Sequence, residues 1–383
     1  MGKRVEKHRL EKSKIYLGKP RKLLRFILKL ALIEVAITPI LGCDPLGTDF
    51  DETQAAIGYE SFQSKSPARK SGDLKIMTWN VKFAGGRIDF FFDCHGDRVH
   101  MTEDEVRKNL DRLAEKIRAY DPDILLLQEV DTDSKRTAHI DMLQYLLDHS
   151  DLNYAAYASQ WKVDFVPSYG LGQVNSGNAI LSKWKLRNST RQSLPLIEEQ
   201  DALTQYFWLQ RNLLVSEVLT PDGPLMVVNV HTSAFSKDGT KQKQIDTFKS
   251  YLDSLDASGK SFVAGGDLNA LPPGSKKTSR FPDSVCPKGD FDADDYSKEQ
   301  TWMASLYDTY QSAISLEDFQ NDNTPYFTHT TNKKEFWNRK LDYLFTNESF
   351  RSGLVHQDKI SGGFETMKLS DHAPITVNLR LNK

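Results

Sequence analysis

Cysteine is scarce in this sequence, with three residues in a chain of 383. Neither Cys94 nor Cys286 has a partner at the spacing of zinc ligands, which argues against a structural zinc site. The third, Cys43, lies at the end of the N-terminal segment. Two cysteines of an exported chain can form a disulfide only if their Cα atoms approach, and the sequence leaves open whether Cys94 and Cys286 do so.

The sequence also lacks a strong excess of charge, because its formal net charge is -2. This balance hides an asymmetry. Residues 1–42 carry 11 Lys and Arg against 3 Asp and Glu, which leaves 39 basic and 49 acidic residues in 43–383 and a net charge of -10 there. Proteins that bind the phosphate backbone of nucleic acids normally present a basic surface. The acidic body therefore disfavours a nucleic acid partner, although it leaves room for a small basic patch.

The N-terminal segment has no unbroken apolar run. Residues 1–22 are strongly basic, and the mostly apolar stretch 23–41 is interrupted by Arg25, Lys29 and Glu34. A basic stretch followed by an apolar segment and a small residue is typical of a secretory signal. The segment therefore indicates export rather than a part of the globular fold.

The Ile-Leu-Gly-Cys sequence that ends at Cys43 resembles a bacterial lipoprotein signal, in which the cysteine carries lipid. We therefore expect residues 1–43 to be a lipoprotein signal. Two other interpretations stay open, an amphipathic or spanning membrane anchor and no membrane role. Residues 44–72 are rich in Gly, Ser, Thr, Gln and Lys and predict a linker. The expected location is the bacterial cell envelope.

The remaining stretch, 73–383, contains no linker and no visible repeat, so we expect one domain. Thr102 and Glu105 form a capping box before a predicted helix. A second helix is expected over 241–255. The predicted strands are 74–81, 123–130, 154–161, 178–184, a hairpin over 213–232, a strand at 262, 341–346 and 373–381. This alternation of strands and helices predicts an α/β protein.

One predicted strand ends in a group of chemically active side chains. The apolar run 261–264 stops at Gly265 and Gly266 and is followed by Asp267 and Asn269. Residues two apart on an extended segment point the same way, so the two polar side chains face one site. The glycines let backbone or substrate come close because they carry no Cβ. Taken alone, the pattern is equally typical of a polar turn.

Other predicted strands end in similar residues. Glu129 follows three leucines, and a carboxylate in such a setting requires a partner or a metal. The other strand-end residues are Asn80, His231, Asp342, Asp371 and His372. Each of these is a weak signal by itself, because a lone histidine at a strand end is more often structural. Their shared position favours a single site.

These strand ends, in this order, resemble the motifs of the endonuclease/exonuclease/phosphatase superfamily. The motifs are Thr78-Trp79-Asn80-Val81, Leu127-Gln128-Glu129-Val130, Val228-Asn229-Val230-His231-Thr232, Gly266-Asp267-Leu268-Asn269-Ala270, Lys340-Leu341-Asp342-Tyr343 and Leu369-Ser370-Asp371-His372-Ala373-Pro374. The resemblance implies a DNase I-like four-layer α/β/β/α sandwich, with two packed, mostly antiparallel sheets and helices outside. It also implies metal-dependent hydrolysis of a phosphoester.

The resemblance further implies a metal site. Glu129, helped by Asn80 and with Asp371 facing the same ion, would hold Mg²⁺, a cation that prefers oxygen ligands. Mn²⁺ and Ca²⁺ are alternatives, and whether one or two ions bind stays open. By the same likeness, Asp342 holds His372, fixes its tautomer and favours its charged form.

The remaining roles implied by the resemblance concern the reaction. His231 would contact a phosphate oxygen or the leaving group, and Asp267 with Asn269 would hold and activate the attacking water. The general base stays open between Asp267 and His372. Asn178 resembles another family motif that lies near the phosphate, and a turn asparagine is the equal alternative for it.

The substrate is less well defined. Residues 337–343 depart from the Trp-Cys-Asp-Arg segment of inositol polyphosphate 5-phosphatases, which argues against that activity. Three phenylalanines in 85–94 either enter lipid or pack internally, and we favour packing. The segment 276–302 is expected to shape the substrate entrance.

We therefore expect a metal-dependent phosphoric ester hydrolase that is a monomer. The favoured activity is a phosphodiesterase that acts on a lipid or small phosphodiester at the envelope. A DNase I-like endonuclease is the alternative, which the acidic body disfavours. A non-catalytic binding module on this fold is the third possibility, and it would require an incomplete catalytic set.

Overall fold

The computed structural model describes residues 50–63, 72–93, 96–234, 238–281, 295–330, 336–358 and 366–381. These residues belong to the unit Leu46–Lys383, and Met1–Pro45 form a separate unit. The predicted signal over 1–43 therefore lies outside the described residues, as do Cys94 and Cys286. In the part of the chain that is described, no helix is both long and apolar enough to cross a membrane.

Two seven-stranded sheets form the centre of the unit. The first, which we call the β4 sheet, has the order β13-β14-β3-β4-β6-β5-β2, and the second, the β10 sheet, has the order β1-β7-β8-β9-β10-β12-β11. The strands of the β4 sheet are β13 Ser349–Val355, β14 Ile375–Arg380, β3 Leu74–Asn80, β4 Ile124–Asp131, β6 Gly172–Ser182, β5 Tyr154–Val166 and β2 Ile57–Glu60. Those of the β10 sheet are β1 Thr53–Ala55, β7 Leu186–Ser193, β8 Asn212–Thr220, β9 Gly223–His231, β10 Phe262–Asp267, β12 Asp342–Thr346 and β11 Gln311–Ser312.

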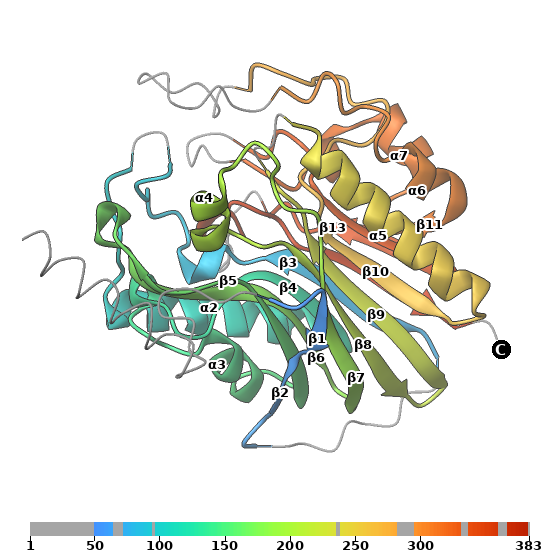
Figure 1. The fold of residues 1–383 in the computed structure, drawn as a ribbon. Coiled ribbons are helices and arrows are strands. Elements are labelled where there is room, and N and C mark those ends of the chain that lie inside the picture. The colour runs from blue at the N-terminus through green and yellow to red at the C-terminus, as the bar shows by residue number, and fades with distance from the viewer. Residues whose placement is uncertain are drawn as a thin grey trace, which may run out of the picture. The chain divides into compact units, whose positions relative to one another are not determined.

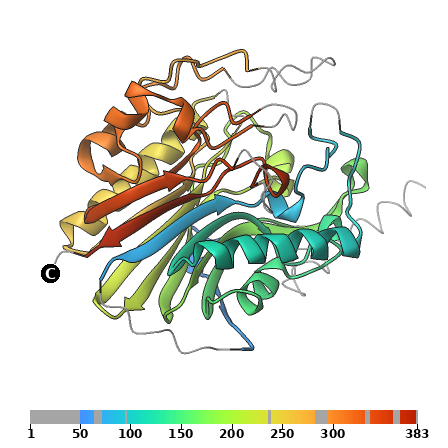
Figure 2. The same cartoon turned by 180° about the vertical axis from the view of Figure 1, so that it is seen from behind.

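Helices cover the outer faces of both sheets, which confirms the predicted α/β/β/α sandwich (Figures 1 and 2). Helices α2 and α3 pack on the β4 sheet, and α5 and α6 pack on the β10 sheet. The helices are α2 Glu103–Tyr120, α3 Met142–Asp148, α4 Ala202–Phe207, α5 Thr240–Ala257, α6 Ala304–Thr309 and α7 Leu316–Asn321. Short 3-10 helices are η1 Lys82–Ala84, η2 Lys135–Thr137, η3 Ser168–Gly170, η5 Thr324–Tyr326 and η6 Thr366–Lys368.

The continuous apolar run in β4 follows from its burial on two sides. Ile124 and Leu126 point into the core between the sheets, whereas Leu125 and Leu127 pack under the outer helices. A strand with both faces covered needs apolar residues at every position rather than at alternate ones. Each fully buried leucine or isoleucine contributes about 1.5–3 kcal/mol through removal of apolar surface from water. The core therefore holds the C-terminal end of β4 firmly in place.

The predicted capping box is present at the start of α2. The Glu105 backbone N–H donates to Thr102 Oγ1 over 3.3 Å, and the Thr102 N–H donates to Glu105 Oε2 over 2.9 Å. The two bonds satisfy backbone donors that the first turn of a helix leaves unpaired. The apolar face expected for this helix is buried at Val106, Leu110, Leu113 and Ile117.

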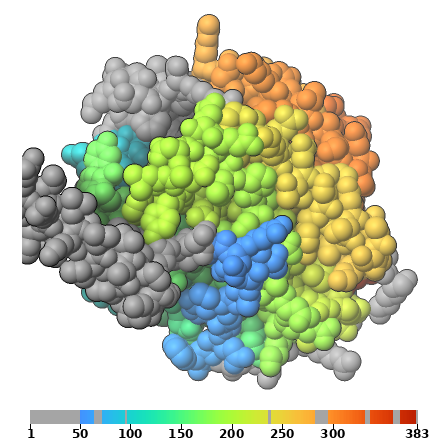
Figure 3. Space-filling view, in the orientation of Figure 1, coloured from blue at the N-terminus to red at the C-terminus, as the bar shows by residue number. Residues whose placement is uncertain are grey.

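The prediction of a linker over 44–72 is wrong for residues 53–60. Strand β1 pairs with β7 and β2 pairs with β5, so this segment closes one edge of each sheet. In the space-filling view it lies flat against the body (Figure 3). The Tyr59 hydroxyl also donates to Asp141 over 3.2 Å. The segment pairs mainly through its backbone, which gives no apolar periodicity in the sequence, and it protects otherwise exposed strand edges.

Candidate active site

The strand register of the β10 sheet brings three of the predicted site residues together. Strands β9 and β10 are parallel, and His231 lies opposite Asp267. Strand β12 runs antiparallel to β10, and Asp342 lies opposite Asp267 on its other side. The glycine before Asp267 is needed for this close packing, because a Cβ on Gly266 would lie 2.0 Å from the Val230 carbonyl oxygen. The sequence run that ends at Asp267 is therefore the centre of the site.

The β4 sheet contributes Asn80 and Glu129 from its parallel strands β3 and β4. The pairing of β4 with β6 shifts between Leu127 and Val130, so Gln128 and Glu129 face the single residue Asn178. Glu129 has a φ of 57°, in the left-handed region. A bulge of this kind changes the direction of a side chain at the end of a strand. The bulge therefore explains how the Glu129 side chain, which follows the apolar residues of β4, turns toward the site.

Asn80 connects the two sheets. Its amide nitrogen donates to Glu129 Oε1 and to Asp267 Oδ2, both over 3.0 Å, and its Oδ1 accepts from the Lys82 backbone N–H. A second hydrogen bond between the two sheets joins β4 to β9, where Gln128 Nε2 donates to Asn229 Oδ1 over 2.7 Å. Buried polar groups that satisfy one another fix the relative position of the elements that carry them.

Two imidazoles approach the same oxygen of Asp267. Oδ2 lies 3.4 Å from His231 Nε2 and 3.5 Å from His372 Nε2. Burial raises the pKa of Asp267 to about 7, against the opposing charge of His372. The other oxygen, Oδ1, accepts from the Asn269 backbone N–H over 3.0 Å, while the Asn269 side chain donates to the Thr232 carbonyl. Asp267 is thus oriented from both sides.

The two imidazoles differ in charge. His372 Nδ1 lies 2.8 Å from Asp342 Oδ2, which is the predicted contact. Burial alone would lower the pKa of His372, but Asp342 and Asp267 raise it to about 10. The pKa of His231 is well below its usual value, first because of burial and then because of the positive charge of Arg211. At neutral pH the site therefore holds one imidazolium and one neutral imidazole.

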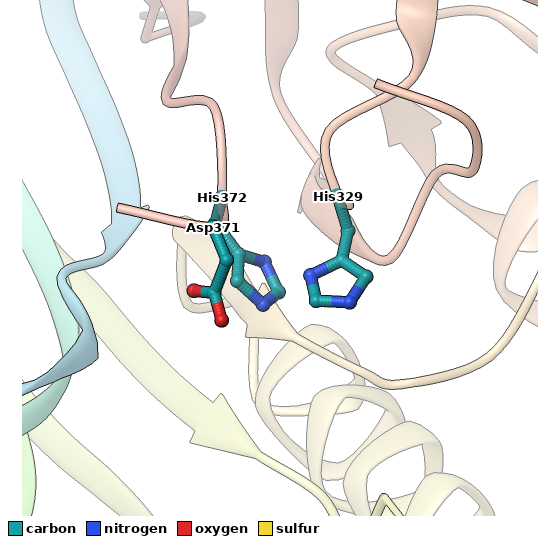
Figure 4. Close-up of side chains that lie close together, drawn as sticks. All are labelled: His329, Asp371 and His372. Carbon is teal, nitrogen blue, oxygen red and sulfur yellow. The ribbon is translucent and has the colours of Figure 1, made fainter. Parts of the chain in front are cut away.

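Asp371 lies on the other side of His372, where His329 also approaches. The side chains of His329, Asp371 and His372 point into one space (Figure 4), and the two imidazole rings are 4.4 Å apart between centroids. Lys82 Nζ lies 3.4 Å from Asp371 Oδ2. Burial would raise the pKa of Asp371, but Lys82 and His372 hold it well below its usual range. Asp371 is therefore a carboxylate surrounded by cationic groups.

A model of the Endonuclease/Exonuclease/phosphatase family matches residues 77–372 of the chain. The chain belongs to this family. Members are metal-dependent phosphoester hydrolases, and the chain is an enzyme of this class. No curated protein sequence matches it.

Solved structures share the fold at low identity. An endonuclease/exonuclease/phosphatase from Beutenbergia cavernae is 20% identical, with a TM-score of 0.52 over 82% of this chain and 72% of that chain. A conserved protein of unknown function from Enterococcus faecalis is 17% identical, with a TM-score of 0.50 over 81% of this chain and 100% of that chain. The catalytic domain of human nocturnin is 18% identical, with a TM-score of 0.49 over 85% and 97%. At identities of 20% or lower, this likeness shows a shared fold and no more.

The donor set of this family member fits a divalent cation. The residues predicted to bind the metal, Glu129 and Asp371 with carboxylate oxygens and Asn80 with an amide oxygen, carry the donor atoms that hard cations prefer. Burial raises the pKa of Glu129, and the negative charge of Asp371 raises it further. Two carboxylates that repel each other in a buried site are stabilised by a cation. Clusters of acidic and histidine side chains around His372 add to the polar character of the site.

The structure places Asn178 opposite the bulge of β4, so it is a strand residue rather than a turn residue. Its side chain is fully buried and its amide donates to Asn212 over 3.4 Å. It is thus near Glu129 in the register, and its predicted contact with substrate stays a prediction.

Sequence reasoning did not identify Arg211, Lys82 and His329 as parts of the site. Arg211 precedes β8 and donates to Gln160 Oε1 over 2.9 Å, and Gln160 in turn donates to the His231 carbonyl over 3.4 Å. Arginine is a common surface residue, so only its tertiary contacts distinguish Arg211. The position of Lys82, two residues after Asn80, was the one usable signal.

Proposed function

We propose that this enzyme is a phosphodiesterase in which Asp267 orients and activates the attacking water. The observation that carries the proposal is the placement of Asp267 between two imidazoles, one charged and one neutral. A hydrolase needs a base beside its nucleophile and positive charge beside the phosphate oxygens. This arrangement supplies both within one cluster of side chains.

The geometry supports Asp267 rather than His372 as the general base. Both ring nitrogens of His372 approach carboxylates, Asp342 at 2.8 Å and Asp267 at 3.5 Å, and carboxylates on both sides favour the cation. An imidazolium has no lone pair with which to accept a proton, so His372 stabilises negative charge on a phosphate oxygen. Asp267 Oδ1 is held by the Asn269 N–H, and Oδ2, which also accepts from Asn80 Nδ2, would take the water proton.

His231 and Arg211 form the other side of the proposed phosphate site. Neutral His231 contacts an oxygen of the phosphate or of the leaving group. The Arg211 side chain is buried, and no carboxylate lies within ion-pair distance of it among the described residues. Burial lowers its pKa to about 10, which still leaves it charged at neutral pH. A buried cation without a carboxylate partner is suited to an anionic substrate.

We further propose that Glu129 and Asn80 hold Mg²⁺, with Asp371 facing the same ion. When bound, the ion would neutralise charge on the phosphate oxygens and polarise the phosphorus–oxygen bonds. The oxygen-only donor set supports Mg²⁺ or Mn²⁺ over softer metals.

For the substrate, we propose a lipid or small phosphodiester at the bacterial envelope, with the chain acting as a monomer. The acidic body and the signal-like N-terminus with Cys43 support this class. The exposed apolar side chains Phe165, Tyr169 and Leu203 on β5, η3 and α4 also suit a lipid surface. An endonuclease remains the alternative. Phe90, Phe91 and Phe92 pack on one another and on Phe83, as favoured from the sequence. These three rings therefore do not help to choose between a lipid and a nucleic acid substrate.

Hydrolysis by the full-length chain, purified in detergent, tests the proposal. The substrates are bis(p-nitrophenyl) phosphate, vesicles of sphingomyelin or phosphatidylcholine, and supercoiled plasmid, each with Mg²⁺, with Mn²⁺ and with EDTA. We expect metal-dependent cleavage of the diesters and intact plasmid. Plasmid nicking would establish the endonuclease instead, and no cleavage of any substrate would overturn the proposal. Asp164→Asn, at an exposed aspartate of β5, is the matched control for the site variants.

A further inference from the structure

The turn after β3 has an unusual backbone. Lys82, Phe83 and Ala84 have φ values of 44°, 40° and 54°, and none of them is glycine. Residues with side chains avoid this left-handed region, and three in succession persist only where surrounding contacts hold them. The turn begins two residues after Asn80, so it lies directly beside the proposed metal site.

Three separate contacts hold the turn. The Lys82 N–H donates to Asn80 Oδ1 over 3.0 Å, and Asn109 Nδ2 donates to the Ala84 carbonyl over 2.8 Å. The buried Phe83 ring lies under the guanidinium of Arg136, 3.8 Å from the ring centroid. The conformation is therefore determined by the fold rather than by the local sequence.

The turn places the Lys82 ammonium between two carboxylates. Nζ lies 3.2 Å from Asp93 Oδ2 and 3.4 Å from Asp371 Oδ2, and the residue is 5% exposed. Arg87, in the same loop, donates to the carbonyls of Thr330 and Ser370. Lys82 thus forms a direct ion pair with Asp371.

We propose that Lys82 is a positioning residue and built-in counter-ion that neutralises Asp371, so that the site binds a single divalent cation, centred on Glu129. A lysine held by two carboxylates in a buried turn is not readily displaced, and its charge repels a second cation from Asp371. One carboxylate with an amide oxygen and a substrate phosphate is sufficient for Mg²⁺, which keeps several of its waters. The proposal does not depend on which phosphoester is the substrate.

Calorimetric titration of the full-length protein with Mn²⁺, without substrate, tests the proposal. We expect the wild type to bind one ion. In Lys82→Met/Asp93→Asn, which removes the buried pair and keeps the net charge of the loop unchanged, we expect binding about 10-fold tighter or a second bound ion. Lys82→Arg keeps the positive charge and should retain one ion at nearly the wild-type affinity. Lys162→Met, at an exposed lysine of β5, is the control for loss of a lysine elsewhere.

Two results would overturn the proposal. One is a wild type that already binds two Mn²⁺ ions, and the other is a double variant that binds one ion with unchanged or weaker affinity. A thermal melt in EDTA accompanies each titration, because a merely structural role would lower the melting temperature without tightening metal binding. Hydrolysis is measured separately, so an inactive wild type that binds one ion would count against the proposed function and not against the role of Lys82.

Discussion

His231 and His372 occupy nearly equivalent positions in the site and differ in charge. Both imidazoles are buried, and their Nε2 atoms lie 3.4 and 3.5 Å from the same oxygen of Asp267. Yet the pKa of His372 is raised to about 10, whereas that of His231 is well below its usual value. The shared contact with Asp267 therefore does not decide the protonation of either ring.

The difference arises at the other ring nitrogen and from the neighbouring charges. His372 Nδ1 is bound to Asp342, whereas His231 Nδ1 has no hydrogen-bond partner in the described part of the chain. Arg211 adds positive charge on the side of His231 and lowers its pKa further. A second carboxylate offsets the cost of burying a charged ring, and a second cation increases it. Two histidines can thus serve one reaction in different protonation states.

The largest effect is expected for Asp267→Asn, which removes the carboxylate that both rings share. We expect kcat to fall by about 10⁴-fold, because a general base and the partner of both imidazoles are lost together. The measurement is the hydrolysis of bis(p-nitrophenyl) phosphate by the full-length chain. A variant that keeps more than about a tenth of wild-type activity would show that Asp267 is not the base. Asp164→Asn should remain fully active.

A smaller loss is expected for Asp342→Asn, which removes the feature that distinguishes His372 from His231. The amide cannot stabilise an imidazolium as a carboxylate does, so kcat should fall by about 10²–10³-fold with little change in KM. Asp342→Glu should recover part of the activity. Equal loss in the Glu and Asn variants would indicate that Asp342 serves packing rather than charge.

The sequence predicted which polar strand ends lie together better than it predicted the edges of the fold. The strand ends at Asn80, Glu129, His231 and Asp267 were visible because an apolar run gives way abruptly to a polar residue. Parallel pairing then brings such ends together at one edge of each sheet. Strands β1 and β2 were missed because their residues are mostly exposed and pair through the backbone, which is common to all residues.

Contacts between sheets could not be predicted from the sequence. The bond of Asn80 to Asp267 joins residues 187 positions apart and depends on how the two sheets pack face to face. The left-handed φ of Glu129 follows from a register shift against β6, for which the sequence of β4 contains no glycine or other marker. The roles of Lys82 and Arg211 depend on the same long-range packing.

The smallest effect on activity is expected for Arg211→Met, which removes the charge that sets His231 apart. Loss of a nearby cation raises the pKa of His231 toward its ordinary value of 6.5, and we expect kcat/KM to fall by about 10-fold as the proposed substrate contact is lost. NMR titration of the His231 ring protons measures the pKa. Arg187→Met, at an exposed ion pair with Glu217, is the matched control.

The same variant has a predictable effect on stability. The folded wild type binds the His231 proton more weakly than the unfolded chain does, so this group stabilises the fold above pH 6.5 and the contribution is lost as the pH falls below that value. Arg211→Met weakens the depression of the pKa, and the loss of stability between pH 7 and pH 5 should become smaller than in the wild type. Chemical denaturation at the two pH values measures the difference. An unchanged His231 pKa and an unchanged pH dependence would show that burial alone, and not Arg211, keeps His231 neutral.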